Sequence, residues 1–187
     1  MSAMAKRRTP DPSLLVVAAF SRYPDALDWA QERLQAAFGP IERVSPDFDF
    51  HHTVYYEKSM GAGLKKRFIV FANLRPSDIL PQAKNFAIGL EKDLASCGRY
   101  PEERPLNLDP GLVQLGKFLL ASTKDQGHRV YLRDGIYAEV TLRFEGKGFE
   151  CWPWTYADYR EPAVREFLSE ARDGLRCKIA QLRTGQE

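Results

Sequence analysis

The sequence is poor in the residues that cross-link small proteins through disulfide bonds or metal ions. Cysteine occurs 3 times in 187 residues, at positions 97, 151 and 177, without CxxC or zinc-finger spacing. Disulfide frameworks use an even set of cysteines, and structural zinc sites use closely spaced pairs. We therefore expect neither, and interpret the three thiols as reduced cysteines of a cytoplasmic protein.

Long hydrophobic runs and a surplus of charge of one sign are also missing. The apolar run 14–20 is far too short to span a bilayer, and the basic N-terminus lacks the apolar core of a signal peptide. The chain carries 27 basic and 25 acidic residues, a formal net charge of +2. The composition thus predicts no membrane association and provides no global basic field for nucleic acid.

Several nucleotide-binding and catalytic motifs are absent as well. No GxxxxGK[ST] occurs, which excludes P-loop GTPase activity. The motifs GxGxxG, HExxH and GxSxG are absent too. The cofactor therefore stays unknown, and whether the protein is an enzyme stays open.

What the sequence does contain is a clear series of structural elements. Helical periods with suitable first-turn and terminal residues predict helices, and apolar or alternating runs predict strands. The expected helices span 21–39, 76–98, 109–120 (beginning at Asp109-Pro110) and 162–182. The expected strands span 14–20, 41–44, 48–56 and 68–71, followed by a hairpin around Asp134-Gly135 and a short strand within 149–159.

This order of elements predicts an α+β fold. Strands do not alternate strictly with helices, which favours a mixed, mainly antiparallel sheet with helices packed on one face. The opening strand–helix–strand–strand–helix is compatible with a ferredoxin-like core. Residues 1–12 are polar and contain two prolines, so we expect a disordered basic tail there and one α+β domain over 13–187.

The predicted hairpin carries the first candidate site. With a two-residue Asp134-Gly135 turn, Val130 faces Glu139, and His128 is a diagonal neighbour of Glu139 on one face, with Arg129 on the other. Such a pair suits a general base with its orienting carboxylate, two metal ligands, or a structural ion pair. Asp125, in the preceding loop, would orient a lysine or a metal. The candidate catalytic residues are His128, Glu139 and Asp125.

Basic residues near loops form the second candidate group. The loop Gly61-Ala62-Gly63 precedes a short basic run and suits anion binding by backbone amides and cations. Lys124 lies in the segment before the hairpin, where functional residues are frequent. The candidate ligand-binding residues are Lys124, Arg129, Lys66, Arg67 and Tyr56, the last at the end of the alternating run 48–56.

Four polar blocks occur in a fixed order: YYEKSMGAGLKKRF (Tyr55–Phe68), RPLNLDPG (Arg104–Gly111), LASTKDQGHRVYL (Leu120–Leu132) and GIYAEVTLRF (Gly135–Phe144). With these blocks the chain resembles an uncharacterised prokaryotic family, domain-of-unknown-function family number 4416, over about residues 12–183. The resemblance implies a cytoplasmic single-domain protein and no particular reaction. Because the four blocks are polar and lie beside loops, the resemblance also favours the hypothesis that they line one site.

Three functions follow as hypotheses. The first is a cytoplasmic protein that either binds, or binds and acts on, a small anionic or phosphorylated ligand. The second is a non-enzymatic module for RNA or a protein partner, suggested by the basic tail and the aromatic segment 152–159. The third is a metal-dependent hydrolase that uses His128 with Glu139 and Asp125.

Overall fold

The α+β class is confirmed in a computed structural model, which describes residues 7–50 and 56–184. Four helices occur in the described residues: α1 (Pro24–Phe38), α2 (Glu57–Met60), α3 (Leu80–Ser96) and α4 (Pro162–Thr184). The strands are β1 (Ser13–Ser21), β2 (Ile41–Val44), β3 (Phe48–Asp49), β4 (Lys65–Arg75), β5 (Asn107–Val113), β6 (Lys117–Ser122), β7 (Arg129–Arg133), β8 (Ile136–Glu145) and β9 (Gly148–Cys151).

Strand β1 lies in the middle of the sheet. All nine of its residues are buried, as a continuous apolar run covered on both faces should be. The main strand order is β2-β4-β1-β5-β6-β8-β7, with β3 paired to β4 and β9 to β8. Strand β1 pairs antiparallel with β4 on one side and β5 on the other.

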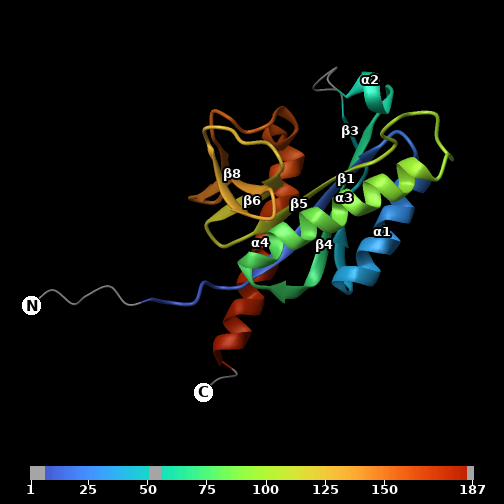
Figure 1. Ribbon diagram of the computed structural model, residues 1–187. Helices are drawn as coiled ribbons and strands as arrows, with labels where there is room; N and C mark the ends of the chain where they lie inside the picture. Colours follow the sequence, from blue (N-terminus) through green and yellow to red (C-terminus); the bar gives the residue numbers. More distant parts are fainter. Residues whose placement is uncertain (1–6, 51–55, 185–187) are drawn as a thin grey trace, which may run out of the picture.

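The elements β1, α1, β2, β4, α3 and β5 occur in the order β-α-β-β-α-β, with β3 and α2 inserted before β4. Helices α1 and α3 pack on one face of the sheet, against Leu15, Val17 and Ala19. Helix α4 lies on the opposite face, against Leu14, Val16 and Ala18 (Figure 1). The sequence predicted all helices on one face of the sheet, and α4 does not follow this prediction. The residues of β1 are apolar on both faces of the sheet, so the second face also requires a covering helix.

The predicted helix 109–120 is wrong. Residues Asn107–Val113 form β5, and Lys117–Ser122 form β6. Proline has no backbone N–H to donate to a neighbouring strand. Pro110 is tolerated because β1 is the only strand that pairs with it among the described residues, since the pairing of β5 with β6 begins at Gly111. Of the leucines that fitted a helical period, Leu112 and Leu120 are buried in these two antiparallel strands, Leu119 is half-buried in β6, and Leu115 lies in the turn between the strands.

The other elements lie close to their predicted positions. Helix α1 falls within the predicted 21–39, α3 within 76–98, and α4 begins at the predicted Pro162. The predicted strand 48–56 is present as β3 at its start, while residues 51–55 lie outside the described residues. Within the described part of the chain, no helix is long and apolar enough to cross a membrane.

Replacement of Gly111 by alanine is expected to lower the free energy of unfolding by about 1–3 kcal/mol, because the new methyl group would overfill the β5–β6 contact. A Cβ at this position would lie 2.5 Å from the Leu119 carbonyl oxygen and 2.7 Å from Cζ of Phe118. Chemical denaturation measures the change. Gly116→Ala is the control, since nothing lies within 4 Å of a Cβ there. Equal loss of stability in both variants would contradict this packing.

Candidate functional site

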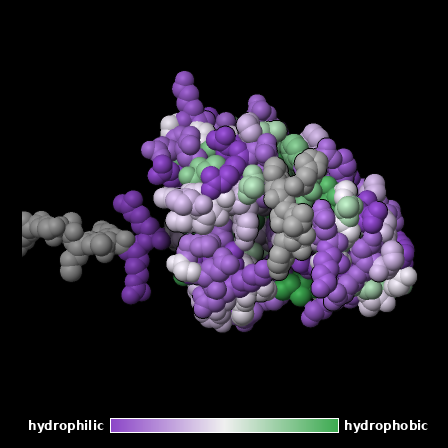
Figure 2. Space-filling model, turned by 90° about the horizontal axis from the view of Figure 1, so that it is seen from above, coloured by the Kyte–Doolittle hydropathy of each residue, from purple (hydrophilic) through white to green (hydrophobic). Residues whose placement is uncertain are grey.

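The strands of the sheet end around a pocket of about 510 Å³. Its walls come from the end of β1, the first residues of β4 and β5, the segment from β6 to β7, the middle of β8, and residues 156–159. These ends lie in the upper part of Figure 1, and Figure 2 views that side from above, where hydrophilic side chains predominate. Small-molecule sites have volumes of about 300–1,000 Å³, so the pocket is large enough for a metabolite.

Basic side chains outnumber acidic ones in the described lining of this pocket. Five of the described lining residues are lysine or arginine, and three are aspartate or glutamate. A surplus of positive charge inside a concave site attracts anions. The basic residues are Lys66, Lys84, Arg104, Lys124 and Arg129; the acidic residues are Asp109, Glu139 and Asp158.

Arg129 and Glu139 form a buried ion pair between β7 and β8. Arg129 Nε donates to Glu139 Oε2 at 3.0 Å, and each side chain is only 1% exposed. A buried pair is stable when hydrogen bonds satisfy its remaining polar atoms. The other guanidinium nitrogens donate to the Ser122 hydroxyl at 2.7 Å, the Lys124 carbonyl oxygen at 3.0 Å and the Tyr156 hydroxyl at 2.5 Å.

The predicted hairpin is present, but its register differs from the prediction. The Asp134-Gly135 turn is followed by β8 as expected, yet the pairing shifts within Tyr131–Arg133. Arg129, rather than Val130, is therefore the residue opposite Glu139. A bulge of this kind moves side chains to the other face of a strand. For this reason Arg129 contacts Glu139 directly, although the sequence had placed the two on opposite faces.

His128 contacts the same carboxylate just before β7 begins. Its Nε2 lies 3.1 Å from Glu139 Oε2, while the Thr141 hydroxyl donates to Glu139 Oε1 at 3.1 Å. The imidazole is stacked on Trp154 with ring centroids 5.4 Å apart. Both oxygens of Glu139 are thus engaged by neighbouring side chains.

A second polar chain joins α3 to β5. Lys84 Nζ donates to Asp109 Oδ1 at 3.0 Å and to the Leu108 carbonyl oxygen at 2.7 Å, and Asn107 Nδ2 donates to Asp109 Oδ2 at 2.8 Å. Burial acts to raise the pKa of Asp109, but the ammonium groups of Lys84 and Lys66 outweigh it and lower this pKa below its usual value. Asp109 is therefore an ionised carboxylate at neutral pH.

Lys66 lies in the pocket wall between a carboxylate and a group of aromatic rings. Its ammonium pairs with Asp158, and the two side chains are 5% and 11% exposed. Cation–π attraction adds to this pair, because aromatic faces surround the same ammonium. The ring centroids lie at 4.3 Å for Tyr159, 5.3 Å for Phe20, 5.4 Å for Phe68 and 5.6 Å for Phe50.

Two more tyrosines contribute hydroxyl groups to the pocket. Burial, followed by the negative charge of Asp109, raises the pKa of Tyr56 above its ordinary value. Burial, followed by the charge of Glu139, raises the pKa of Tyr156. Both hydroxyls keep their protons at neutral pH and remain able to donate hydrogen bonds.

The structure places five of the predicted site residues in one pocket. Tyr56, Lys66, Lys124, Arg129 and Glu139 all line it. They come from five separate parts of the chain: the residue before α2, β4, the β6–β7 segment, β7 and β8. Their convergence is a product of the sheet topology.

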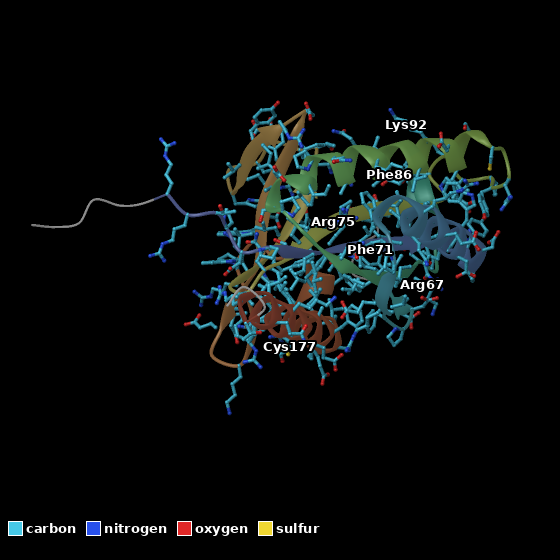
Figure 3. All side chains as sticks on the ribbon, turned by 90° about the horizontal axis from the view of Figure 1, so that it is seen from below. Arg67, Phe71, Arg75, Phe86, Lys92 and Cys177 are labelled. Carbon is cyan, nitrogen blue, oxygen red and sulfur yellow. The ribbon has the colours of Figure 1, made fainter. Side chains whose placement is uncertain are left out.

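Arg67 does not belong to this group. Successive residues of a strand point to opposite faces, so Arg67 lies on the α1 face of the sheet while Lys66 faces the pocket. Its guanidinium binds Asp47 and Asp28, with a shortest distance of 2.6 Å to each. Arg67 is labelled in Figure 3. The pKa of Arg67 is raised, chiefly by the hydrogen bond to Asp47. The candidate ligand-binding residue Arg67 therefore lies outside the described lining of the pocket, whereas Lys66 belongs to it.

Two predicted catalytic residues lie outside the described lining of the pocket. His128 contacts Glu139 and Trp154, and Asp125 is exposed. Within residues 7–50 and 56–184, no group of three or more His, Cys, Asp or Glu side chains lies close enough to hold a metal ion. His128, Glu139 and Asp125 thus do not form the metal-ligand set considered from the sequence.

Sequence reasoning missed several residues of the pocket. The expected helix beginning at Asp109-Pro110 gives Asp109 a structural role, and neither Asp109 nor its neighbour Asn107 is among the candidate site residues. Both belong to the block RPLNLDPG, whose polarity beside a loop was a usable signal. Lys84 shares a helical stripe with buried Leu80 and Ala87, and a lysine in such a stripe requires a buried partner. Residues 156–159 stood out only as part of the aromatic segment 152–159, which gave no signal that they line this pocket.

Replacement of Glu139 by glutamine is expected to lower the free energy of unfolding by about 3 kcal/mol, because Arg129 would keep a buried charge without its counter-charge. Thermal and chemical denaturation measure this loss. Glu145→Gln is the matched control on β8, since Glu145 forms an exposed pair with Arg143 and should change stability by less than about 1 kcal/mol. Wild-type stability in Glu139→Gln would show that the pair does not organise the wall.

Comparison with family models gives one match, to a domain of unknown function (DUF4416), over residues 11–174. Comparisons with curated proteins and with solved structures give no match.

Proposed function

The chain belongs to the DUF4416 family, and we propose that its pocket binds a small anionic ligand such as a phosphorylated metabolite. The observation that carries this proposal is the charge of the described lining, with five basic and three acidic side chains around about 510 Å³. Because the walls are partly apolar, charge–charge attraction inside the pocket is stronger than it would be in bulk water.

The basic residues divide into a buried set and an outer set. Lys66, Lys84 and Arg129 are buried and bound to carboxylates. Arg104 and Lys124 are more accessible: the Arg104 side chain is 36% exposed and pairs with Glu91 at 2.9 Å, and Lys124 lies in an exposed loop segment. The buried cations are bound to the pocket's own carboxylates, so the accessible donors of Arg104 and Lys124 are the basic groups that an entering anion would meet. The anionic group of the ligand would bind beside Arg104 and Lys124.

Binding is the function proposed, because only one member of the predicted catalytic pair, Glu139, belongs to the described lining of the pocket. Glu139 is engaged by Arg129, His128 and Thr141. Because both oxygens of Glu139 are already engaged, its role is to position Arg129. His128, in turn, is stacked on Trp154 outside the described lining.

An RNA- or protein-binding module is the second candidate, and one observation favours it. Trp152 and Trp154 are stacked with ring centroids 5.2 Å apart, and the Arg143 guanidinium lies 4.8 Å from the Trp152 ring. Trp154 is 37% exposed. Stacked rings beside an arginine suit an unpaired base. This surface does not belong to the anionic pocket, so the two candidates use different residues.

Replacement of Lys124 by glutamine is expected to weaken phosphate-ester binding about tenfold, the effect of losing one charge-assisted hydrogen bond. A thermal-shift titration with inorganic phosphate, glycerol 3-phosphate and ribose 5-phosphate measures binding at constant ionic strength. Lys117→Gln removes the same charge from the opposite end of β6, away from the pocket, and should bind like wild type.

Two results would contradict anion binding in this pocket. The first is an absence of stabilisation of the wild-type protein by every phosphate compound. The second is an equal loss of binding in Lys124→Gln and Lys117→Gln, which would indicate non-specific attraction to surface charge.

A further inference from the structure

One polar group in the pocket wall has no hydrogen-bond partner among the residues that the structure describes. The Tyr159 side chain is 1% exposed, and its hydroxyl is buried without a partner. A buried hydroxyl without a partner is costly, and such groups are rare in folded proteins. Tyr159 also lines the pocket, so a bound molecule is in a position to supply the missing bond.

The ring of Tyr159 is held firmly in place. It lies against Phe68 and Phe118, with ring centroids 5.6 and 5.7 Å away, and its face contacts the Lys66 ammonium. These contacts fix the direction of the hydroxyl without using it. A polar group that is fixed in this way is preorganised for a ligand, because binding costs little side-chain entropy.

The protonation state of Tyr159 defines what it can bind. Burial, reinforced by the negative charges of Asp158 and Asp109, raises its pKa well above the ordinary tyrosine value. The hydroxyl therefore stays neutral over the physiological range and can always donate.

The charges near Tyr159 indicate which kind of ligand oxygen suits this position. Asp158, Asp109 and Glu139 all raise its pKa, so all three carboxylates are near enough to act on the hydroxyl. Lys66, Lys84 and Arg129 balance these carboxylates, so this end of the pocket has no surplus positive charge to attract an anionic oxygen. A ligand hydroxyl suits the position better, because it accepts from Tyr159 and donates to a carboxylate.

We propose that Tyr159 is a specificity-determining residue, whose hydroxyl donates a hydrogen bond to a hydroxyl oxygen of the ligand. The ligand is then a hydroxylated phosphate monoester, with its phosphate beside Arg104 and Lys124 and its hydroxyl group beside Tyr159. The inference rests on the proposed function, since it assigns the uncharged end of the same ligand.

The first test uses stability without ligand. Tyr159→Phe removes a hydroxyl that has no partner, so its melting temperature should equal or exceed that of wild type. Tyr156→Phe is the matched control, because the Tyr156 hydroxyl accepts from Arg129 and its loss should lower the melting temperature by about 2–4 °C. A fall in Tyr159→Phe as large as that in Tyr156→Phe would overturn the proposal.

The second test compares probes with and without hydroxyl groups. The probes are ribose 5-phosphate, glycerol 3-phosphate, propyl phosphate and inorganic phosphate, with binding measured by isothermal titration. Wild type should prefer at least one hydroxylated ester to propyl phosphate by about tenfold, and Tyr159→Phe should lose this preference while its affinity for inorganic phosphate is unchanged.

The outcomes separate this inference from the proposed function. If wild type binds none of the four probes, both fail. If inorganic phosphate binds but no hydroxylated ester is preferred, or if Tyr159→Phe keeps the preference, anion binding stands and the role of Tyr159 is refuted.

Discussion

A single buried arginine connects most of the segments that form the pocket. Arg129 pairs with Glu139 on β8 and donates to the end of β6, to the segment after it, and to Tyr156. A guanidinium buried to this extent requires every one of these acceptors, since an unpaired buried charge is strongly destabilising. The shape of the wall therefore depends on satisfying Arg129, and a ligand meets a surface that is already organised.

The pocket combines buried, paired charges in its inner wall with accessible basic side chains in its outer part. Its buried lysines, Lys66 and Lys84, are matched by Asp158 and Asp109, so the inner wall presents hydrogen-bond donors and acceptors rather than net charge. The accessible cations lie nearer the opening. This distribution suits a molecule with one charged end and one polar, uncharged end, and it explains how a protein of net charge +2 can attract an anion at one place.

Local signals in the sequence were sufficient for the helices and for the fold class, because α1, α3 and α4 have both an apolar stripe and a proline in their first turn or at their start. They failed at β5 and β6, where Asp109-Pro110 imitates a helix start. The pairing of β5 with β1, and of β6 with β5 and β8, outweighed that local preference.

The candidate site was predictable only in part, for a geometric reason. Sequence reasoning found Lys66, Lys124 and Glu139 because basic residues and a hairpin are visible locally. It placed Arg129 on the wrong face because a bulge within β7 carries no sequence signature. It missed Asp158 and Tyr159 because their role comes from contact with β4, which is distant in the sequence.

The central claim is that one pocket at the end of the sheet binds a hydroxylated phosphate ester. An amide chemical-shift titration with ribose 5-phosphate at constant ionic strength tests it most directly. The account predicts saturable shifts concentrated in 104–109, 122–129 and 156–159, with residues around Arg67 unaffected. Shifts that are absent from these three segments, or that spread uniformly over the basic surface, would contradict it.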